Sequence, residues 1–216
     1  MDTKILPVLD AAQIRVLGAL MEKSKTTPDY YPMTLNGLSA ACNQKTSRKP
    51  VVNYGDDIIG TALNSLKIAG LISTATGGSI RNIKYKHNFA IVFPVLPSEV
   101  AIMCLLFLRG PQTPGEINTN SGRLYEFETL EEVNEVLEKL ASEGYIKQLP
   151  KRPGQKEQRY MHLFAGDIEF IDEDYALDES PAKSNSQLEE RVIKLETELA
   201  ELKENLAKLM AELGVE

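Results

Sequence analysis

Side chains that can bind nucleic acid gather in one stretch of the first half of the chain. Lys45, Arg48 and Lys49 stand close together, and Asn53 and Tyr54 follow them. Ammonium and guanidinium groups pair with backbone phosphates, and an asparagine amide can pair with adenine. Two later stretches with the alternation of β-hairpins add further basic residues. The candidate DNA-binding residues are Lys45, Arg48, Lys49, Asn53, Tyr54, Arg81, Lys84, Lys86, Lys151, Arg152, Lys156 and Arg159.

Acidic residues oppose DNA binding at the helices that would enter a groove. Asp56 and Asp57 open the helix after the basic stretch, and the matching helix in the second half carries Glu131, Glu132 and Glu135. Carboxylates near a helix N-terminus stabilise the helix, but they also repel phosphate. The basic stretch is therefore a DNA contact or a solvated loop, and the charge pattern fits both. The first half is the better DNA-binding candidate.

The residue types used in catalysis occur without the spacing that catalysis requires. His87 and His162 each lie in or beside a predicted strand, remote in sequence from Cys42 and Cys104. Neither a metal-binding HExxH nor a paired CxxC is present, and no Ser/His/acid spacing stands out. We expect no enzyme, no metal and no cofactor. The two cysteines are predicted to be buried apolar residues, as in a reducing cytoplasm.

Charge is distributed unevenly along the 216 residues. Residues 1–90 carry 11 Lys+Arg against 6 Asp+Glu, a net charge of +5, and residues 91–164 carry 8 against 10, a net of −2. Residues 165–216 carry 5 against 15, a net of −10. The first part is thus mildly basic, which favours nucleic-acid contact weakly. No apolar run is long enough to span a membrane, and the N-terminus lacks the pattern of a signal peptide.

A ten-residue phrase at residues 63–72 returns at residues 137–146. In both copies two leucines three residues apart precede a glycine and two apolar residues: Leu63, Leu66 and Gly70 match Leu137, Leu140 and Gly144. This pattern predicts an amphipathic helix, a glycine that ends it and the start of a strand. A repeat of this length indicates that a structural unit is duplicated.

The elements around each copy of the phrase occur in the same order. Three helices and a two-stranded hairpin are expected in each half, which is the order of a winged helix. The predicted class is mainly α with small β-hairpin wings (α+β), built as two tandem winged-helix domains. Thr129 and Glu132 are expected to form a capping box at the last helix. The predicted helices are 9–23, 35–42, 54–69, 97–108, a short one from 113 and one from 130; the strands are 71–74, 82–86, 145–149 and 159–164.

The last part of the chain has a heptad pattern. Eight apolar residues alternate at spacings of four and three, which specifies a left-handed coiled coil. A parallel homodimer is favoured, and a single helix folded onto its own domains is the alternative. The predicted dimer contacts are Leu188, Val192, Leu195, Leu199, Leu202, Leu206, Leu209 and Leu213. The predicted domains are 1–93 and 94–165, followed by an acidic linker at 166–186 and the coiled coil at 187–214.

Several long polar strings resemble the bacterial YceH-type proteins, a family of unknown function. They include residues 31–45 from Tyr31 to Lys45, residues 109–116 from Arg109 to Glu116, and residues 121–127. The resemblance covers about residues 10–165 and implies a tandem winged-helix fold in a cytoplasmic bacterial protein. Where the family often has basic residues, this chain has Asn118, Thr119 and Asn120.

Two functions follow as expectations. The first is a DNA-binding winged-helix protein that regulates transcription as a homodimer on double-stranded DNA. The second is a non-catalytic adaptor that uses the same domains to hold a protein partner, because a fold does not fix a function. Binding to duplex DNA that weakens steeply with salt separates the first from the second.

Overall fold

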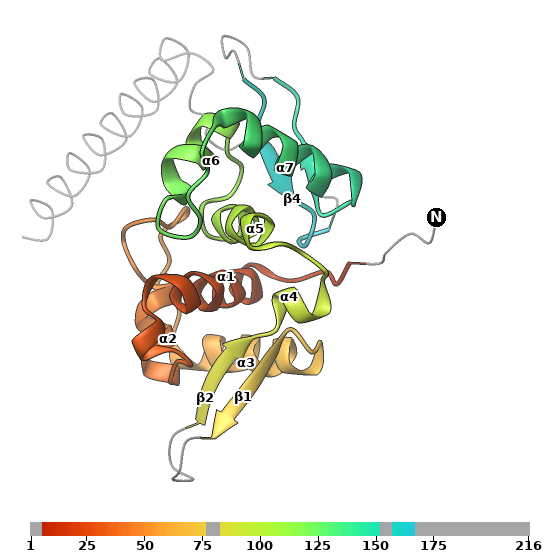
Figure 1. The fold of residues 1–216 in the computed structure, drawn as a ribbon. Coiled ribbons are helices and arrows are strands. Elements are labelled where there is room, and N and C mark those ends of the chain that lie inside the picture. The colour runs from red at the N-terminus through yellow and green to blue at the C-terminus, as the bar shows by residue number, and fades with distance from the viewer. Residues whose placement is uncertain (1–5, 77–82, 152–156, 167–216) are drawn as a thin grey trace, which may run out of the picture. The chain divides into compact units, whose positions relative to one another are not determined.

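The computed structural model describes residues 6–76, 83–151 and 157–166, and this part is mainly helical with small antiparallel hairpins (Figure 1). The predicted fold class, α+β, is confirmed at this level. The coiled coil at 187–214 and the linker from residue 167 onward lie outside the described residues. The elements are α1 (Ala11–Thr26), the 3₁₀ helix η1 (Pro28–Tyr30), α2 (Leu35–Cys42), α3 (Asp56–Ile68), β1 (Ile72–Thr76), β2 (Ile83–His87), α4 (Phe89–Val92), α5 (Pro97–Arg109), α6 (Pro114–Ser121), α7 (Leu130–Ser142), β3 (Ile146–Gln148) and β4 (Tyr160–His162).

The repeated phrase forms the same helix end twice. Gly70 and Gly144 have φ angles of 73° and 77°, a left-handed conformation that glycine adopts without steric cost. After α3, Leu71 N–H donates to Leu66 O at 2.9 Å, and after α7, Tyr145 N–H donates to Leu140 O at 3.0 Å. These bonds satisfy the last helical carbonyls in a Schellman motif. The repeat therefore specifies two equivalent helix-to-strand turns.

The two halves also share a backbone pairing that the sequence did not predict. Met33 pairs with Tyr85 of β2 as an isolated bridge, and Gln112 pairs with Tyr160 of β4 in the same way. In each half the bridge residue directly precedes the threonine that caps the second helix, Thr34 for α2 and Thr113 for α6. Each hairpin is thus tied to the start of its own second helix, and the duplication extends to tertiary structure.

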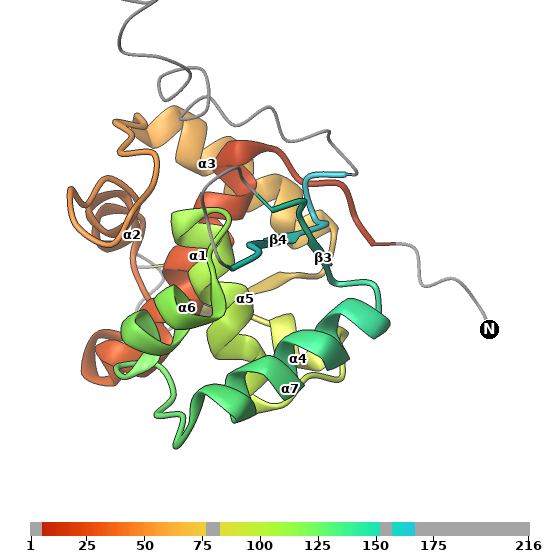
Figure 2. The ribbon, with the colours of Figure 1, turned by 90° about the horizontal axis from the view of Figure 1, so that it is seen from above.

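Helices α1 and α5 lie side by side at the centre of residues 1–167, which form one compact unit (Figures 1 and 2). The approach is close because α1 has a glycine at the contact. A Cβ atom at Gly18 would lie 3.0 Å from Leu108 Cδ2 and from Phe107 Cβ. The first helices of the two halves therefore pack directly on each other. The predicted boundary at residue 93 stays a prediction.

The hydrogen bonds at the starts of α7 and α6 can be compared with the capping box predicted for α7. Thr129 Oγ1 accepts from Glu132 N–H at 3.2 Å, but the Glu132 carboxylate accepts from Glu128 N–H instead of the Thr129 N–H. The predicted capping box is therefore only half formed. A full box closes α6, where Thr113 N–H donates to Glu116 Oε2 and Glu116 N–H donates to Thr113 Oγ1.

Two short elements differ from the prediction. The stretch at 28–30, which lies between the predicted helices 9–23 and 35–42, forms η1. Helix α4 forms between β2 and α5, where only a domain boundary was expected. Four residues are too few to show a helical period, so α4 leaves no sequence signal. Its Phe89 is fully buried, and the ring packs against Phe107 of α5 and against Phe164.

His162 on β4 is buried and predicts a loss of stability in mild acid. Its ring packs edge-on against Phe107 at 5.0 Å, and burial lowers its pKa to about 4. The unfolded chain binds the proton near pH 6.5. The stability that the protein gains from keeping His162 neutral is therefore complete above that pH and is lost as pH falls toward 4. Between pH 7 and 5 we expect His162 to lower the free energy of unfolding by about 2 kcal/mol. Denaturant unfolding of wild type and His162→Gln checks this, since the variant should lose that share of the pH dependence. An equal pH dependence in both proteins would refute it.

Candidate nucleic-acid interface

Helix α3 buries one face and exposes the other. The leucines of the repeated phrase, together with Ile59 and Ala62, are buried against α1 and α2. The outward side chains recur at helical spacing and were not among the predicted contacts. Extending the 3.6-residue period from the buried positions would have identified them. They are Asp57, Thr61, Asn64 and Lys67.

The segment that leads into α3 is fixed to the core by its own side chains. Asn43 Nδ2 donates to Tyr54 O at 2.9 Å, and Tyr54 N–H donates to Asn43 Oδ1 at 2.7 Å. Lys49 N–H donates to Leu108 O at 2.9 Å, which ties the segment to the end of α5. Lys45, Lys49 and Asn53 are exposed on this segment, and Tyr54 is half-buried. Three of the predicted contacts are thus presented to solvent from a defined backbone.

The Arg48 side chain is not available to solvent, because it is buried in the fold. Its side chain is fully buried, and its NH2 atom lies 2.6 Å from Glu22 Oε2. The same guanidinium donates to Ala41 O and to Gln44 Oε1. These bonds hold the segment before α3 onto α1 and α2. We therefore leave Arg48 out of the proposed DNA contacts, because a phosphate would have to displace Glu22.

A second arginine supports the same segment and was missed in the sequence. Arg15 on α1 donates from NH1 to Cys42 O at 3.2 Å and from NH2 to Pro50 O at 2.6 Å. Burial lowers its pKa, and the charge of Arg48 adds to the effect. Its sequence signal was a charged residue beside the apolar stripe of α1. Arg15 and Arg48 together bind carbonyls at both ends of the basic segment.

The first hairpin places two of its predicted lysines on one side. Lys84 and Lys86 alternate along β2, opposite Ala75 and Ser73 of β1. Lys86 is exposed and Lys84 is half-buried. Because side chains two apart on a strand share a face, both ammonium groups belong to the same surface of the hairpin. Arg81 lies outside the described residues.

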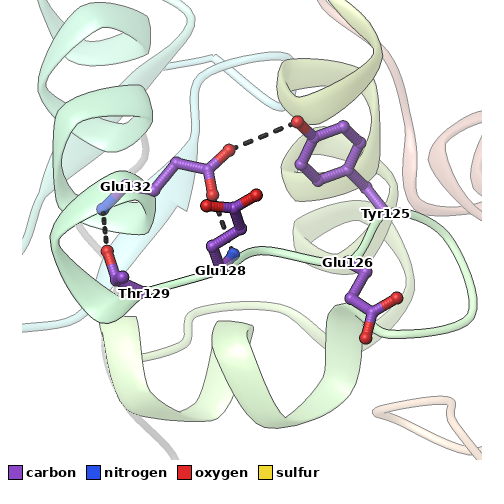
Figure 3. Close-up of a pocket in the computed structure, with 5 residues that line it drawn as sticks. All are labelled: Tyr125, Glu126, Glu128, Thr129 and Glu132. Atoms are coloured by element: carbon purple, nitrogen blue, oxygen red, sulfur yellow. Dashed lines mark hydrogen bonds between the residues drawn. The ribbon is translucent and has the colours of Figure 1, made fainter.

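In the second half the surface at the start of α7 carries carboxylates, whereas in the first half the surface around α3 carries lysines. A pocket of about 370 Å³ opens at the start of α7, lined by Tyr125, Glu126, Glu128, Thr129 and Glu132 (Figure 3). Tyr125 Oη donates to Glu132 Oε1 at 3.2 Å, and the charge of Glu132 raises the pKa of that phenol. Glu131, Glu135 and Glu138 are exposed further along α7. This surface therefore carries the carboxylates that the sequence places on α7.

Of the four basic residues predicted on the second hairpin, the structure describes two. Lys151 is exposed, and Arg152 and Lys156 lie outside the described residues. Arg159 is half-buried and lines a pocket that also contains Lys49. The structure thus brings one predicted contact from each half together, at a place that the sequence alone did not indicate.

Groups that could do chemistry are buried or dispersed in the part of the chain that the structure describes. No cluster of three or more His, Cys, Asp or Glu side chains there could hold a metal ion. Burial raises the pKa of the Cys42 thiol to about 12 and lowers that of His87 to about 4. Cys42 and Cys104 are buried, as predicted. The helices of the described residues are too short or too polar to cross a membrane.

Comparison with known proteins agrees with the predicted resemblance. Residues 9–155 match the family model described as "Protein of unknown function, DUF480". A UPF0502 protein of Solibacter usitatus is 48% identical over 197 residues, covering 90% of this chain and 93% of that protein. The UPF0502 protein of Pectobacterium carotovorum is 43% identical over 211 residues, covering 94% and 98%. The UPF0502 protein YceH of Escherichia fergusonii is 41% identical over 213 residues, covering 95% and 98%. These names state no activity.

Proposed function

This chain belongs to DUF480, a family of proteins of unknown function, and from that premise we propose that it binds double-stranded DNA through its first half. On this proposal the protein is a cytoplasmic transcriptional regulator that acts as a homodimer. Three helices followed by a hairpin, found twice, support the assignment of two winged helices. In helix-turn-helix proteins the later helix of the motif enters the major groove, which corresponds to α3 here.

The observation that carries the proposal is the arrangement of lysines around α3. Exposed Lys45 and Lys49 stand on the fixed segment before the helix, and Lys84 and Lys86 follow it on the hairpin. Between them, α3 exposes Asn64 and Lys67, which can donate to base edges or phosphates. Thr61 is exposed beside them, and its hydroxyl donates to Asp57 O at 2.9 Å. Asp56 and Asp57 lie in the first turn, where their charges favour the helix. We infer that the C-terminal two turns of α3 approach the DNA.

The dimer is proposed from the heptads at residues 187–214. Leu and Val alternate there at the spacing of a two-stranded coiled coil. On this proposal, two copies of α3 in a dimer contact one duplex, which doubles the phosphate contacts. Light scattering after size exclusion measures the mass directly, and a mass of 24.0 kDa, that of one chain, would contradict the dimer.

DNA binding is expected to depend on Lys45 and Lys86. We expect the affinity for a mixed-sequence duplex to fall steeply between about 50 and 200 mM salt, because each phosphate contact releases counterions. The double variant Lys45→Gln/Lys86→Gln should bind more weakly, and its plot of log K against log salt should be shallower by about 1 for each lysine lost. Fluorescence anisotropy of a labelled duplex gives both quantities.

Arg123→Gln, which removes one positive charge, provides the control for this experiment. Arg123 is exposed and stands in the second half, after α6. Because Arg123 lies outside the proposed DNA surface, loss of its charge should leave the salt slope at the wild-type value. Absence of binding at the lower salt concentration, or equal slopes for the control and the double variant, would exclude the proposed surface.

The acidic surface of α7 favours a second candidate, a protein-interaction adaptor. Exposed Glu131, Glu135 and Glu138 form a negative face beside the pocket shown in Figure 3. Such a face suits a basic protein partner and excludes DNA. A protein that binds no duplex but loses a partner on Glu131→Lys/Glu135→Lys substitution would support the adaptor.

A further inference from the structure

Helix α3 carries an isoleucine in the middle of its outward face. The residues of this face follow one another at spacings of four, three and four, so they form one stripe along the helix. They are Asp57, Thr61, Asn64 and Ile68. Ile68 is 90% exposed, the largest exposed fraction among the large apolar side chains that the structure describes. A partner that covered Ile68 would remove this apolar surface from water.

The fold itself does not require an apolar residue at this position. The repeated phrase places Ser142 of α7 at the position of Ile68, and Glu138 at the position of Asn64. Both helices nevertheless end in the same left-handed glycine turn. The Ser142 hydroxyl bonds within its own helix by donating to Lys139 O at 2.8 Å. The exposed isoleucine therefore belongs to the first copy alone, which is also the copy whose surface carries the lysines proposed for DNA.

The residues around Ile68 favour DNA over protein as the partner of this stripe. Lys67 precedes Ile68 and is exposed, and Lys86 is exposed on the hairpin that follows the helix. Lysine is depleted at protein–protein interfaces, whereas its ammonium group pairs well with backbone phosphates. Asn64 lies one helical turn before Ile68 and is also exposed, so its amide is available at the same surface. An apolar side chain beside an amide and within a basic surface suits the edge of a base pair.

We propose, on the basis of the DNA binding proposed above, that Asn64 and Ile68 read neighbouring A·T base pairs in the major groove. An asparagine amide can pair with N6 and N7 of adenine, and an apolar side chain packs on the 5-methyl group of thymine. Residues four apart are separated by about 6 Å along a helix and successive base pairs by about 3.4 Å, so the two side chains reach positions within about two base pairs. The preferred ligand is thus duplex DNA with an A·T step, and the thymine methyl group covers Ile68.

Replacement of thymine by deoxyuridine tests the methyl contact, because deoxyuridine lacks only the 5-methyl group. A duplex of alternating adenine and thymine presents the same steps along its whole length, and its counterpart carries deoxyuridine at each thymine. We expect the full chain to bind the thymine duplex about fourfold more tightly at about 50 mM salt, which is the effect of burying one methyl group. Fluorescence anisotropy of the two labelled duplexes gives both affinities.

Two variants assign the two contacts, and a third is the matched control. Ile68→Ser introduces the residue type that α7 has at the equivalent position, so the protein should stay folded and should bind the thymine and deoxyuridine duplexes equally. Asn64→Ala should lower the preference for the thymine duplex over an alternating G·C duplex by about tenfold, because a bidentate contact with adenine is lost. Ile91→Ser should keep both wild-type preferences, since Ile91 is 82% exposed on α4, outside the proposed DNA surface. Thermal unfolding shows whether each variant is folded.

The possible results separate base reading by α3 from DNA binding itself. A wild-type protein that binds duplex DNA but does not distinguish thymine from deoxyuridine overturns the role of Ile68 and leaves DNA binding intact. A protein that binds none of the duplexes overturns DNA binding, and base reading with it. A preference for thymine that Ile68→Ser retains also overturns the role of Ile68, and its exposed side chain would then be left for an apolar contact with a protein. An unchanged preference for A·T over G·C in Asn64→Ala overturns the role of Asn64.

Discussion

Replacement of Glu22 by alanine is expected to lower the free energy of unfolding by about 3–5 kcal/mol. Glu22 forms two hydrogen bonds with Arg48, at 2.6 Å from NH2 and 3.1 Å from NH1. The Arg48 side chain is 0% exposed and that of Glu22 is 13% exposed. Removal of the carboxylate leaves a guanidinium charge buried without its counterion, which is more costly than loss of the pair itself. Denaturant unfolding at neutral pH measures the change.

The double variant Glu22→Leu/Arg48→Met separates the cost of an unpaired charge from the value of the pair. Because both charges are removed together, it should lose much less stability than Glu22→Ala. The single variant should also weaken the hold on the segment before α3. A change within about 1 kcal/mol for Glu22→Ala would show that water reaches Arg48 and that the pair is not buried in solution.

The Glu22 carboxylate adds a second pH-dependent loss of the free energy of unfolding, at a lower pH than the loss caused by His162. Burial alone would raise the pKa of Glu22, but the hydrogen bonds and charge of Arg48 outweigh it and bring the pKa below 4.5. The unfolded chain takes up the proton first, so the contribution of Glu22 is present above pH 4.5 and is lost as pH falls below it. His162 loses its contribution between pH 6.5 and 4, so the two steps differ in position and in the variant that removes each.

The elements with strong local signals could be predicted from the sequence. Helix α2 begins and ends at the predicted residues, 35 and 42, because Thr34 caps it and its apolar spacing is regular. The two glycine turns after α3 and α7 follow from the repeated phrase. Helix α4 and the bridges to Met33 and Gln112 could not be predicted, because a four-residue helix has no period and a single bridge depends on residues more than 40 positions apart.

The candidate site was less predictable than the fold, and Arg48 shows why. In the sequence it stands between Ser47 and Lys49 in a polar segment, which predicts a solvated side chain. Its partner Glu22 lies 26 residues earlier on α1, so the ion pair arises only when the segment folds back. Gln112 and Arg159 join Lys49 at the pocket for the same reason. Residue types indicated the chemistry, and tertiary contacts decided which residues are available for it.

Phe164 stands at the centre of the aromatic cluster that connects the two halves. Its ring lies 5.6 Å from Phe89, 5.2 Å from Phe93 and 5.3 Å from Phe107, and it stacks on Tyr145 at 6.3 Å. Phe164 O also accepts the Leu9 N–H at 2.7 Å, which ties the start of the chain to the end of the described residues. The cluster thus includes α4, α5 and the second hairpin, and its packing maintains the relative position of the halves.

Phe164→Ala is therefore expected to destabilise the protein by about 3–5 kcal/mol, because it opens a cavity that four rigid rings cannot fill. Phe164→Leu keeps most of the volume and should lose less. Tyr30→Ala is the matched control: Tyr30 is 78% exposed, so its loss should change the free energy of unfolding by less than about 0.5 kcal/mol. Denaturant melts of the three variants give the ranking. If Phe164→Ala fell within the range of Tyr30→Ala, the cluster would not hold the halves together.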